Sequence, residues 1–274
     1  DTLPGVSGSP NMGEAVDMVV QGTDERVRAV SSYKKRLRTG TRALLEHIDG
    51  LVNRMPEALH LSRESFVYDP QVSAYFSGMD QIEKLCQQNS EVDEYISSSA
   101  TSGDASLFAL LFLNYIERDI FATELQGDIL QRDVRRTGVV FAGHKFRSPA
   151  GSDAEIRQSL KRILFDNVVE HIKGLLGRRR MADADRKLGG ATLPSGEGDL
   201  NNPIVYLASL VKLLELPLDL IRLHENMVRI NRMGIKLPDA TEPRGDEIRL
   251  QQLEIGADTT SLILLTKISL ASVP

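Results

Sequence analysis

The sequence predicts a mainly α protein, a multi-helix bundle of six to eight helices with a small C-terminal β-hairpin. Three observations lead to this fold class. Apolar residues recur at three- and four-residue intervals as far as Met233, which is the spacing of amphipathic helices. The segment Ser106–Arg136 shows this spacing with the most apolar composition and is expected to be the central core helix. After Gly234, two short runs read as strands joined by turn residues.

Composition narrows the class of protein further. The 274 residues include 33 Lys and Arg against 38 Asp and Glu, a formal net charge of −5, which argues against polyanion binding over the whole surface. Apolar residues make up 41% of the chain, so a core can form without disulfides or a structural metal. Cys86 is the single cysteine and suits a reducing compartment, and we expect a cytoplasmic protein. No apolar run reaches the roughly 20 residues of a membrane-spanning helix, so no membrane span is expected.

Helices are predicted through the first half of the chain. Glu14–Met55 is expected to form either one long kinked helix or two helices broken near Thr39–Gly40–Thr41. Asp69–Pro70 should open a helix that runs through Leu85 and stops near Asn89, because proline suits the first helical position. Ser90 with Asp93 suggests a cap for a short helix that ends at the serines 97–99.

The second half begins after the predicted central helix. Residues 139–146 are expected to be a short strand or an ordered loop. Ser152 or Asp153 can cap a helix that keeps apolar spacing to Gly177 and continues as a polar extension to Lys187. Pro203 should start another helix, Pro217 should kink or end it, and Leu218–Met233 should continue as helix. Glu247–Ile255 and Ser261–Leu270 are the two predicted strands of the terminal hairpin.

These elements suggest four regions. Residues 1–13 read as a flexible N-terminus and 14–188 as a helical bundle domain. Residues 189–202 are rich in glycine and include Pro194, as expected of a linker or hinge. Residues 203–274 should form a helical pair plus the hairpin, packed on the bundle, since two strands alone are marginal in water.

Catalytic chemistry finds little support in the sequence. Three histidines stand beside a glutamate, but neighbouring helical residues point about 100° apart, whereas bundle metal sites use residues three or four apart. A metal site built on Glu117, Glu124, His47, His171 and His224 is therefore a third-ranked hypothesis. Cys86 is expected to be inert packing, and no nucleophile elbow or phosphate-binding loop occurs. We expect no catalytic residues, no metal and no cofactor.

Two candidate interaction surfaces remain. The first is a basic strip that could hold phosphates or an acidic partner, although a solvated helix end is its simplest interpretation. Its residues are Arg157, Lys161, Arg162, Lys173, Arg178, Arg179, Arg180, Arg186 and Lys187. The second is the apolar face of the C-terminal hairpin, formed by Ile248, Leu250, Leu262 and Leu264.

The function we expect is non-enzymatic: a helical interaction or assembly protein that self-associates or is a subunit of a larger complex. Its partner would be another protein or a second copy. The alternative is a nucleic-acid-associated protein that uses the Arg157–Lys187 strip or a winged-helix-like C-terminal region, where Arg222 and Arg229 would lie on the reading helix. Steep weakening of binding by salt would distinguish that alternative.

Overall fold

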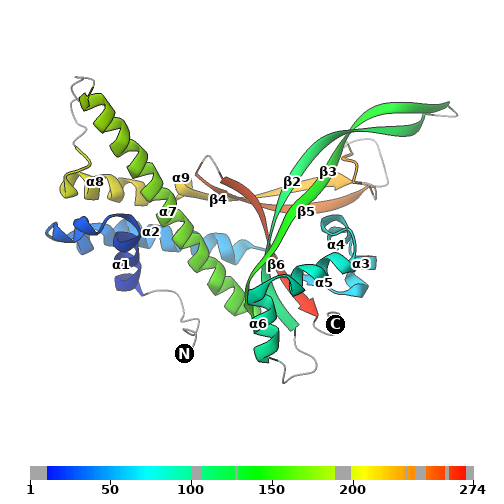
Figure 1. Ribbon diagram of the computed structural model, residues 1–274, viewed down its shortest axis with the longest axis horizontal. Coiled ribbons are helices and arrows are strands. Elements are labelled where there is room, and N and C mark those ends of the chain that lie inside the picture. Colours follow the sequence, from blue (N-terminus) through cyan, green and yellow to red (C-terminus); the bar gives the residue numbers. More distant parts are fainter. Residues whose placement is uncertain are drawn as a thin grey trace. The chain divides into compact units, whose positions relative to one another are not determined.

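The computed structural model describes residues 11–99, 106–126, 129–188, 199–231, 234–237, 245–256 and 259–269, and it shows a mixed α/β protein (Figure 1). A six-stranded, predominantly antiparallel sheet accompanies the helices, so the predicted mainly α bundle with a small hairpin is wrong. The expected N-terminal tail up to residue 10 and the linker over 189–198 lie outside the described residues.

The chain divides into two compact units. Unit 1 combines residues 1–55, 157–222 and 254–259, and unit 2 combines residues 56–156, 223–253 and 260–274. Each unit is therefore built from segments that are far apart in the sequence, and each is described by itself below.

Unit 1 is helical. It contains α1 (Met12–Thr23), the 3₁₀ helix η1 (Glu25–Ala29), α2 (Tyr33–Arg54), most of α7 (Asp153–Leu188), α8 (Pro203–Leu214) and α9 (Pro217–Leu220). The predicted helix from Ser152 or Asp153 and the helix from Pro203 are confirmed, and Ser152 and Asn202 cap them through their side chains. The helix predicted over Glu14–Met55 breaks at Asp24 and not at Gly40, because the Asp24 carboxylate accepts from the backbone N–H of Arg26 and starts η1.

Gly40 lies inside α2, and the absence of a side chain at this position allows another helix to pack closely against α2. A Cβ atom at this position would lie 2.7 Å from Cβ of Leu214 on α8, closer than van der Waals contact allows. Glycine therefore lets α2 and α8 approach at this point, at the usual cost in helix propensity. What looks like a helix break in the sequence is a packing position in the structure.

The predicted core helix over Ser106–Arg136 is wrong, since this region forms most of a long antiparallel hairpin. Its strands are β2 (Ser106–Gln126) and β3 (Ile129–Ala150), so residues 139–146 also lie in a strand. The first half of β2 is buried, including the adjacent residues Ala109, Leu110 and Leu111. A strand buried on both faces reads as a continuous apolar run and fits helical spacing by chance.

The other strands are β1 (Leu59–Leu61), β4 (Ile221–Ile230), β5 (Asp246–Ile255) and β6 (Thr259–Ser269). The sheet order is β3-β2-β6-β5-β4, and β1 pairs with β6 in parallel. The two predicted terminal strands are confirmed as β5 and β6, but they lie in the middle of the sheet. The predicted helix Leu218–Met233 is wrong because the chain leaves α9 directly into β4, and this strand also excludes the winged-helix interpretation.

The helices of unit 2 are short: α3 (Arg63–Tyr68), α4 (Pro70–Tyr75), α5 (Met79–Gln87) and α6 (Ser90–Ser99). They pack with the sheet around one hydrophobic core that includes Val72, Phe76 and Ile82 from the helices and Leu111 and Phe146 from the strands. The single helix predicted after Asp69–Pro70 is two helices, α4 and α5, and Asn89 caps α6 in place of the predicted Ser90 and Asp93 pair.

None of the helices that the structure describes has the length and apolar character that crossing a membrane requires.

The packing at Gly40 gives a stability prediction. Gly40→Val should lower the free energy of unfolding by roughly 1–3 kcal/mol, because the added side chain overlaps Leu214. Gly50→Ala is the matched control in the same helix, since nothing lies within 4 Å of its added Cβ, and it should raise stability by up to about 1 kcal/mol. Urea unfolding of both variants checks this. Equal effects of the two substitutions would contradict the close approach of α2 and α8.

Candidate functional site: a groove and an arm in unit 2

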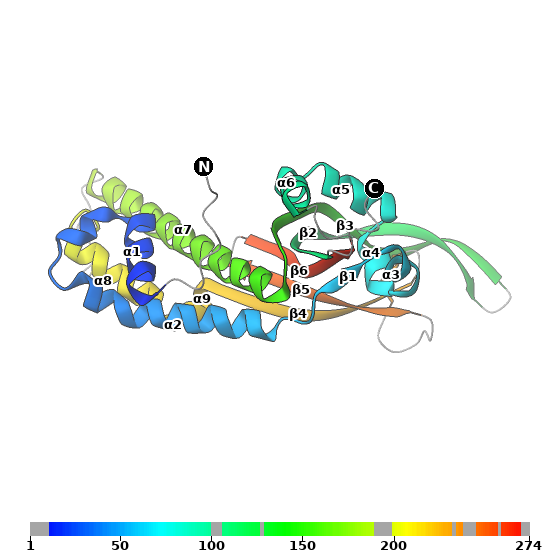
Figure 2. The same ribbon diagram turned by 90° about the horizontal axis from the view of Figure 1, so that it is seen from below.

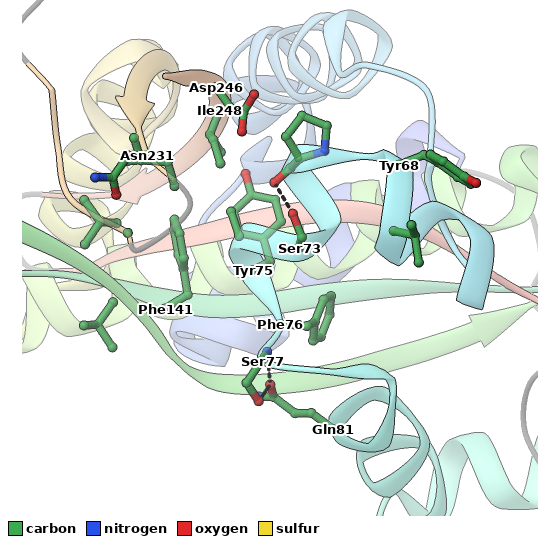
Figure 3. Close-up of a pocket in the computed structure, with 17 residues that line it drawn as sticks. Tyr68, Ser73, Tyr75, Phe76, Ser77, Gln81, Phe141, Asn231, Asp246 and Ile248 are labelled. Carbon is green, nitrogen blue, oxygen red and sulfur yellow. Dashed lines mark hydrogen bonds between the residues drawn. The ribbon is translucent and has the colours of Figure 1, made fainter. Parts of the chain in front are cut away.

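A groove of about 910 Å³ opens in unit 2 (Figure 3). Its lining comes from α3 and α4, from residues 139–141 of β3, and from residues around the end of β4 and the start of β5. β4 and β5 are neighbours in the sheet order, whereas β3 and β4 are its two outer strands. They are brought together by residues 234–237, which bridge the two outer strands through the pairs Gly138–Ile235 and Ile230–Lys236. The groove is therefore a product of this bridging.

Tyr75 and Phe141 form the aromatic base of the groove. The buried Tyr75 hydroxyl donates to the Arg249 carbonyl oxygen over 2.6 Å, and the Gln71 side-chain amide donates to the same oxygen over 3.0 Å. The rings of Tyr75 and Phe141 meet edge to face with centroids 4.8 Å apart. Burial raises the pKa of Tyr75 well above its usual range, so the hydroxyl stays protonated and acts as a structural donor.

The polar groups of the groove are committed to local structure. The Ser73 hydroxyl donates to the Pro70 carbonyl, and the Ser77 hydroxyl donates to the side-chain oxygen of Gln81, as Figure 3 shows. None of the described residues that line the groove is a histidine or a cysteine. The serines thus lack an adjacent base of the kind that activates a nucleophile.

The edge of the groove is apolar and exposed. Val67 and Tyr68 at the end of α3 and Val140 on β3 all line it, and all three are exposed to solvent. Clustered exposed apolar side chains are typical of surfaces that contact other proteins. Asp246 is the one carboxylate among the described residues of the lining, and these include no lysine or arginine, so the groove has little charge with which to select a ligand.

His144 on β3 forms hydrogen bonds to residues of α4 and α5. Its Nε2 donates to the Tyr75 carbonyl oxygen over 2.6 Å, since a carbonyl can only accept, and its Nδ1 accepts from the Gln81 amide over 3.3 Å. Its ring packs against Phe76 with centroids 5.1 Å apart. Burial lowers the pKa of His144 because it disfavours the charged imidazolium, and the hydrogen bond to the Tyr75 carbonyl opposes this shift in part.

A projecting arm is the second feature of unit 2. The pairing of β2 with β6 extends to Leu113 opposite Leu262, whereas its pairing with β3 continues to Gln126 opposite Ile129. Figures 1 and 2 show the two strands leaving the sheet as a ribbon. We call residues 117–126 and 129–139 the arm.

The outer part of the arm carries exposed apolar side chains. Phe121 is 71% exposed, Ile129 72% and Leu130 57%. Nearer the sheet the arm is fastened by charge, because the Lys236 ammonium donates to the Glu117 carboxylate over 2.8 Å, and this bond is the main cause of a lowered Glu117 pKa. Asp119 on β2 pairs with Arg135 on β3 across the ribbon. The arm therefore has a fixed base and an apolar outer part.

The two strands of the arm differ in regularity. The β2–β3 register shifts between Phe108 and Leu110, between Phe112 and Asn114, and between Ala122 and Glu124, and in each case the extra residue belongs to β3. β3 has a residue with positive φ at each shift: Ser148, Gly143 and Asp133. β2 is regular throughout, so only the edge of β3 is interrupted by bulges.

The predicted basic strip lies along α7, and most of its described members contact groups of unit 1. Arg157 donates to the Val52 carbonyl over 2.8 Å, and Lys161 pairs with Asp49 over 2.9 Å. Arg180 pairs with Asp24 over 2.8 Å and lies over the Tyr206 ring. Lys173 pairs with Glu170 on the same helix. Arg179 is half-buried, whereas Arg162 and Arg178 are exposed. The side chains of Arg186 and Lys187 are not among those that the structure describes.

Asp24 is the charged centre of that group. Its carboxylate accepts from both Arg26 and Arg180, and the bond from Arg26 is the largest cause of a pKa held well below its usual range. The carboxylate therefore stays ionised and neutralises part of the strip. A count of the charges along α7 does not reveal Asp24 as a partner, because Asp24 lies far from α7 in the sequence.

The predicted hairpin surface is not exposed. Ile248, Leu250, Leu262 and Leu264 are all buried in the core of unit 2, where Leu107, Leu111 and other β2 residues share the cluster. A helix over Ser106–Arg136, as predicted, would leave the hairpin without β2, the strand that pairs with β6 in the structure. The strand pair with exposed apolar side chains is instead the outer arm.

The candidate metal ligands do not assemble. Among the described residues, no group of three or more His, Cys, Asp or Glu side chains could hold a metal ion. Positions 117 and 124 are on a strand, not on the helix that the metal hypothesis requires, and His47 donates to the Ile221 carbonyl over 3.0 Å. Burial raises the pKa of Cys86 to about 11, so this thiol stays protonated at neutral pH.

The groove residues were not predicted, because no local motif in the sequence marks Tyr75, Gln71 or Phe141. The arm had one signal that could have been used. Gly127–Asp128 stands between two runs of matching length, and a Gly-Asp pair in such a place favours a hairpin turn.

Protein-family models give no match to this chain, and neither do the curated proteins or the solved structures with which it was compared.

The environment of His144 predicts a pH dependence. Because its folded-state pKa lies below the ordinary value of about 6.5, the unfolded chain binds the proton more readily, and the free energy of unfolding should fall as pH drops through 6.5. The contribution is fully present above that pH and levels off once the folded state is protonated too. Denaturant unfolding at pH 7.5 and pH 5.5 measures it. His144→Asn should have a flatter profile; an unchanged slope would assign the dependence to other groups.

Proposed function

We propose that this chain is a non-enzymatic interaction and assembly protein that self-associates or forms a subunit of a larger complex, with the arm as its main association surface. The observation that carries the proposal is the ribbon beyond Leu113, where β2 and β3 leave the sheet and expose Phe121, Ile129 and Leu130. Two strands without a third are marginal in water, so a partner strand or surface would stabilise them.

The charge of the arm fits a protein partner. Between Arg118 and Arg136 the sequence has four arginines and four acidic residues, so the outer arm is neutral. A neutral, apolar ribbon has no attraction for phosphates, whereas it can gain free energy by burying its apolar side chains. The groove, with its exposed apolar edge, adds a second surface for a protein ligand.

Nucleic-acid association by the basic strip is the weaker alternative. Arg157, Lys161 and Arg180 are engaged with carbonyl or carboxylate groups of unit 1, so binding phosphates would require breaking these contacts. Binding of duplex DNA that weakens steeply with salt would favour this alternative over the proposal.

Shortening the arm tests the proposal. Residues 120–136 are replaced by Asn-Gly, which joins the paired residues Asp119 and Thr137 by a two-residue turn and keeps the core segments 106–113 and 139–150. The full chain should sediment as an oligomer, and the shortened chain should sediment as a monomer. Circular dichroism and thermal unfolding should show that both are folded. An oligomer of unchanged mass after shortening would overturn the assignment of the arm. A full chain that stays monomeric at about 100 μM would overturn self-association.

A further inference from the structure

We infer that the partner of the arm is a second copy of this chain, and that the two copies pair antiparallel through the outer edges of β2 around a two-fold axis at Phe121. This inference rests on the proposed function and specifies its partner. It is carried by the free length of the β2 edge, by the difference between the two strands of the arm, and by the charge pattern of β2.

Only β2 offers a regular edge. β3 is interrupted by bulges at Asp133, Gly143 and Ser148, and bulges are a common way to keep an edge strand from pairing. The base of β3 is also covered, because Gly234 and Lys236 exchange backbone hydrogen bonds with Val139 and Thr137. A strand that adds to the arm therefore meets fewer obstacles on β2.

The free part of the β2 edge has a defined length. β6 begins at Thr259, and the register that pairs Leu113 with Leu262 would bring that first residue opposite Ile116. The edge of β2 is thus without β6 from Glu117 to its last residue, Gln126. A second arm can occupy this stretch without displacing β6.

Symmetry limits the possible registers. Two identical antiparallel strands that pair edge to edge are related by a two-fold axis perpendicular to the sheet. Residues that face each other then lie on the same side of the ribbon, so their residue numbers are both odd or both even. The two-fold axis must then lie at a single residue position, which faces its own copy, and not midway between two consecutive positions. With Phe121 on the axis, residues 117–125 of one copy pair with residues 125–117 of the other, and these positions fill the free edge almost completely.

Charge selects the same register. With Phe121 at the centre, Arg118 stands opposite position 124 of the second copy, where the sequence has Glu, and this pair occurs twice in the dimer. A centre at Ile120 puts Asp119 opposite Phe121 and joins no opposite charges. A centre at Asp119 places the two identical carboxylates against each other, which is destabilising.

The register also gives Phe121 a partner. In the monomer its side chain is 71% exposed, and in the pair it stands directly opposite its own copy. Directly opposed side chains on one face of an antiparallel pair are about 5 Å apart at Cβ, and aromatic pairs at such positions are stabilising. The dimer would extend the two-stranded ribbon to four strands.

Charge reversal tests the register in the full chain. Arg118→Glu and Glu124→Arg should each raise the dimer dissociation constant roughly 10- to 100-fold, because each creates two like-charge pairs. The double variant R118E/E124R should restore most of the affinity, since it exchanges the charges and keeps the pairing. Arg132→Glu on β3 is the matched control and should leave the constant unchanged. Sedimentation equilibrium measures all four, and single variants that bind as tightly as the parent chain would overturn the register.

A cross-link provides a second readout that does not depend on charge. Phe121→Cys places two thiols opposite each other on the axis, while the native Cys86 is buried. Mild oxidation should convert this variant into a disulfide-linked dimer, whereas Arg132→Cys should stay largely unlinked. A dimer that the shortened arm abolishes, but that neither R118E weakens nor F121C links, would refute the register and retain the proposed function. An oligomer that survives shortening would refute both.

Discussion

Backbone hydrogen bonding along β2 is the constraint on which the rest of unit 2 depends. Every N–H and C=O of a strand needs a partner, and β2 is 21 residues long whereas its neighbour β6 has only 11. On one side the chain solves this by folding back as β3 over the full length. On the other side, β6 pairs with the inner part of β2, and no strand among the described residues of unit 2 pairs with the outer part. The core, the groove wall at Phe141 and the arm all follow from this unequal pairing.

The sequence predicted the elements whose signals are local. Ser152 and Pro203 mark the starts of α7 and α8, and the turn residues after Ile255 mark the β5–β6 hairpin, since caps and turns act within a few residues. The strands β2 and β4 were predicted as helices. In β2 the apolar residues are adjacent at Ala109–Leu111, and burial on both faces removes the alternation that identifies a strand.

The candidate surfaces could not be predicted for a related reason. Whether a charge or an apolar side chain is available depends on residues that are distant in the sequence. Arg180 is partly neutralised by Asp24, and Leu262 is covered once β2 is recognised as its neighbour. The Tyr75–Arg249 hydrogen bond at the groove likewise joins α4 to β5. A single sequence gives the identity of these groups but not their proximity, whereas the Gly127–Asp128 pair in the sequence was a local signal for the arm.

The pairing of β2 with both β3 and β6 also imposes an order on folding. β2 and β3 are consecutive in the chain and can pair as soon as both exist, whereas Leu107 must wait for its partner Ile268, which comes much later in the chain. During synthesis the hairpin therefore exists for a time with the apolar inner edge of β2 uncovered. An uncovered edge strand is open to mispairing, and the pairing of β6 with β2 covers this edge.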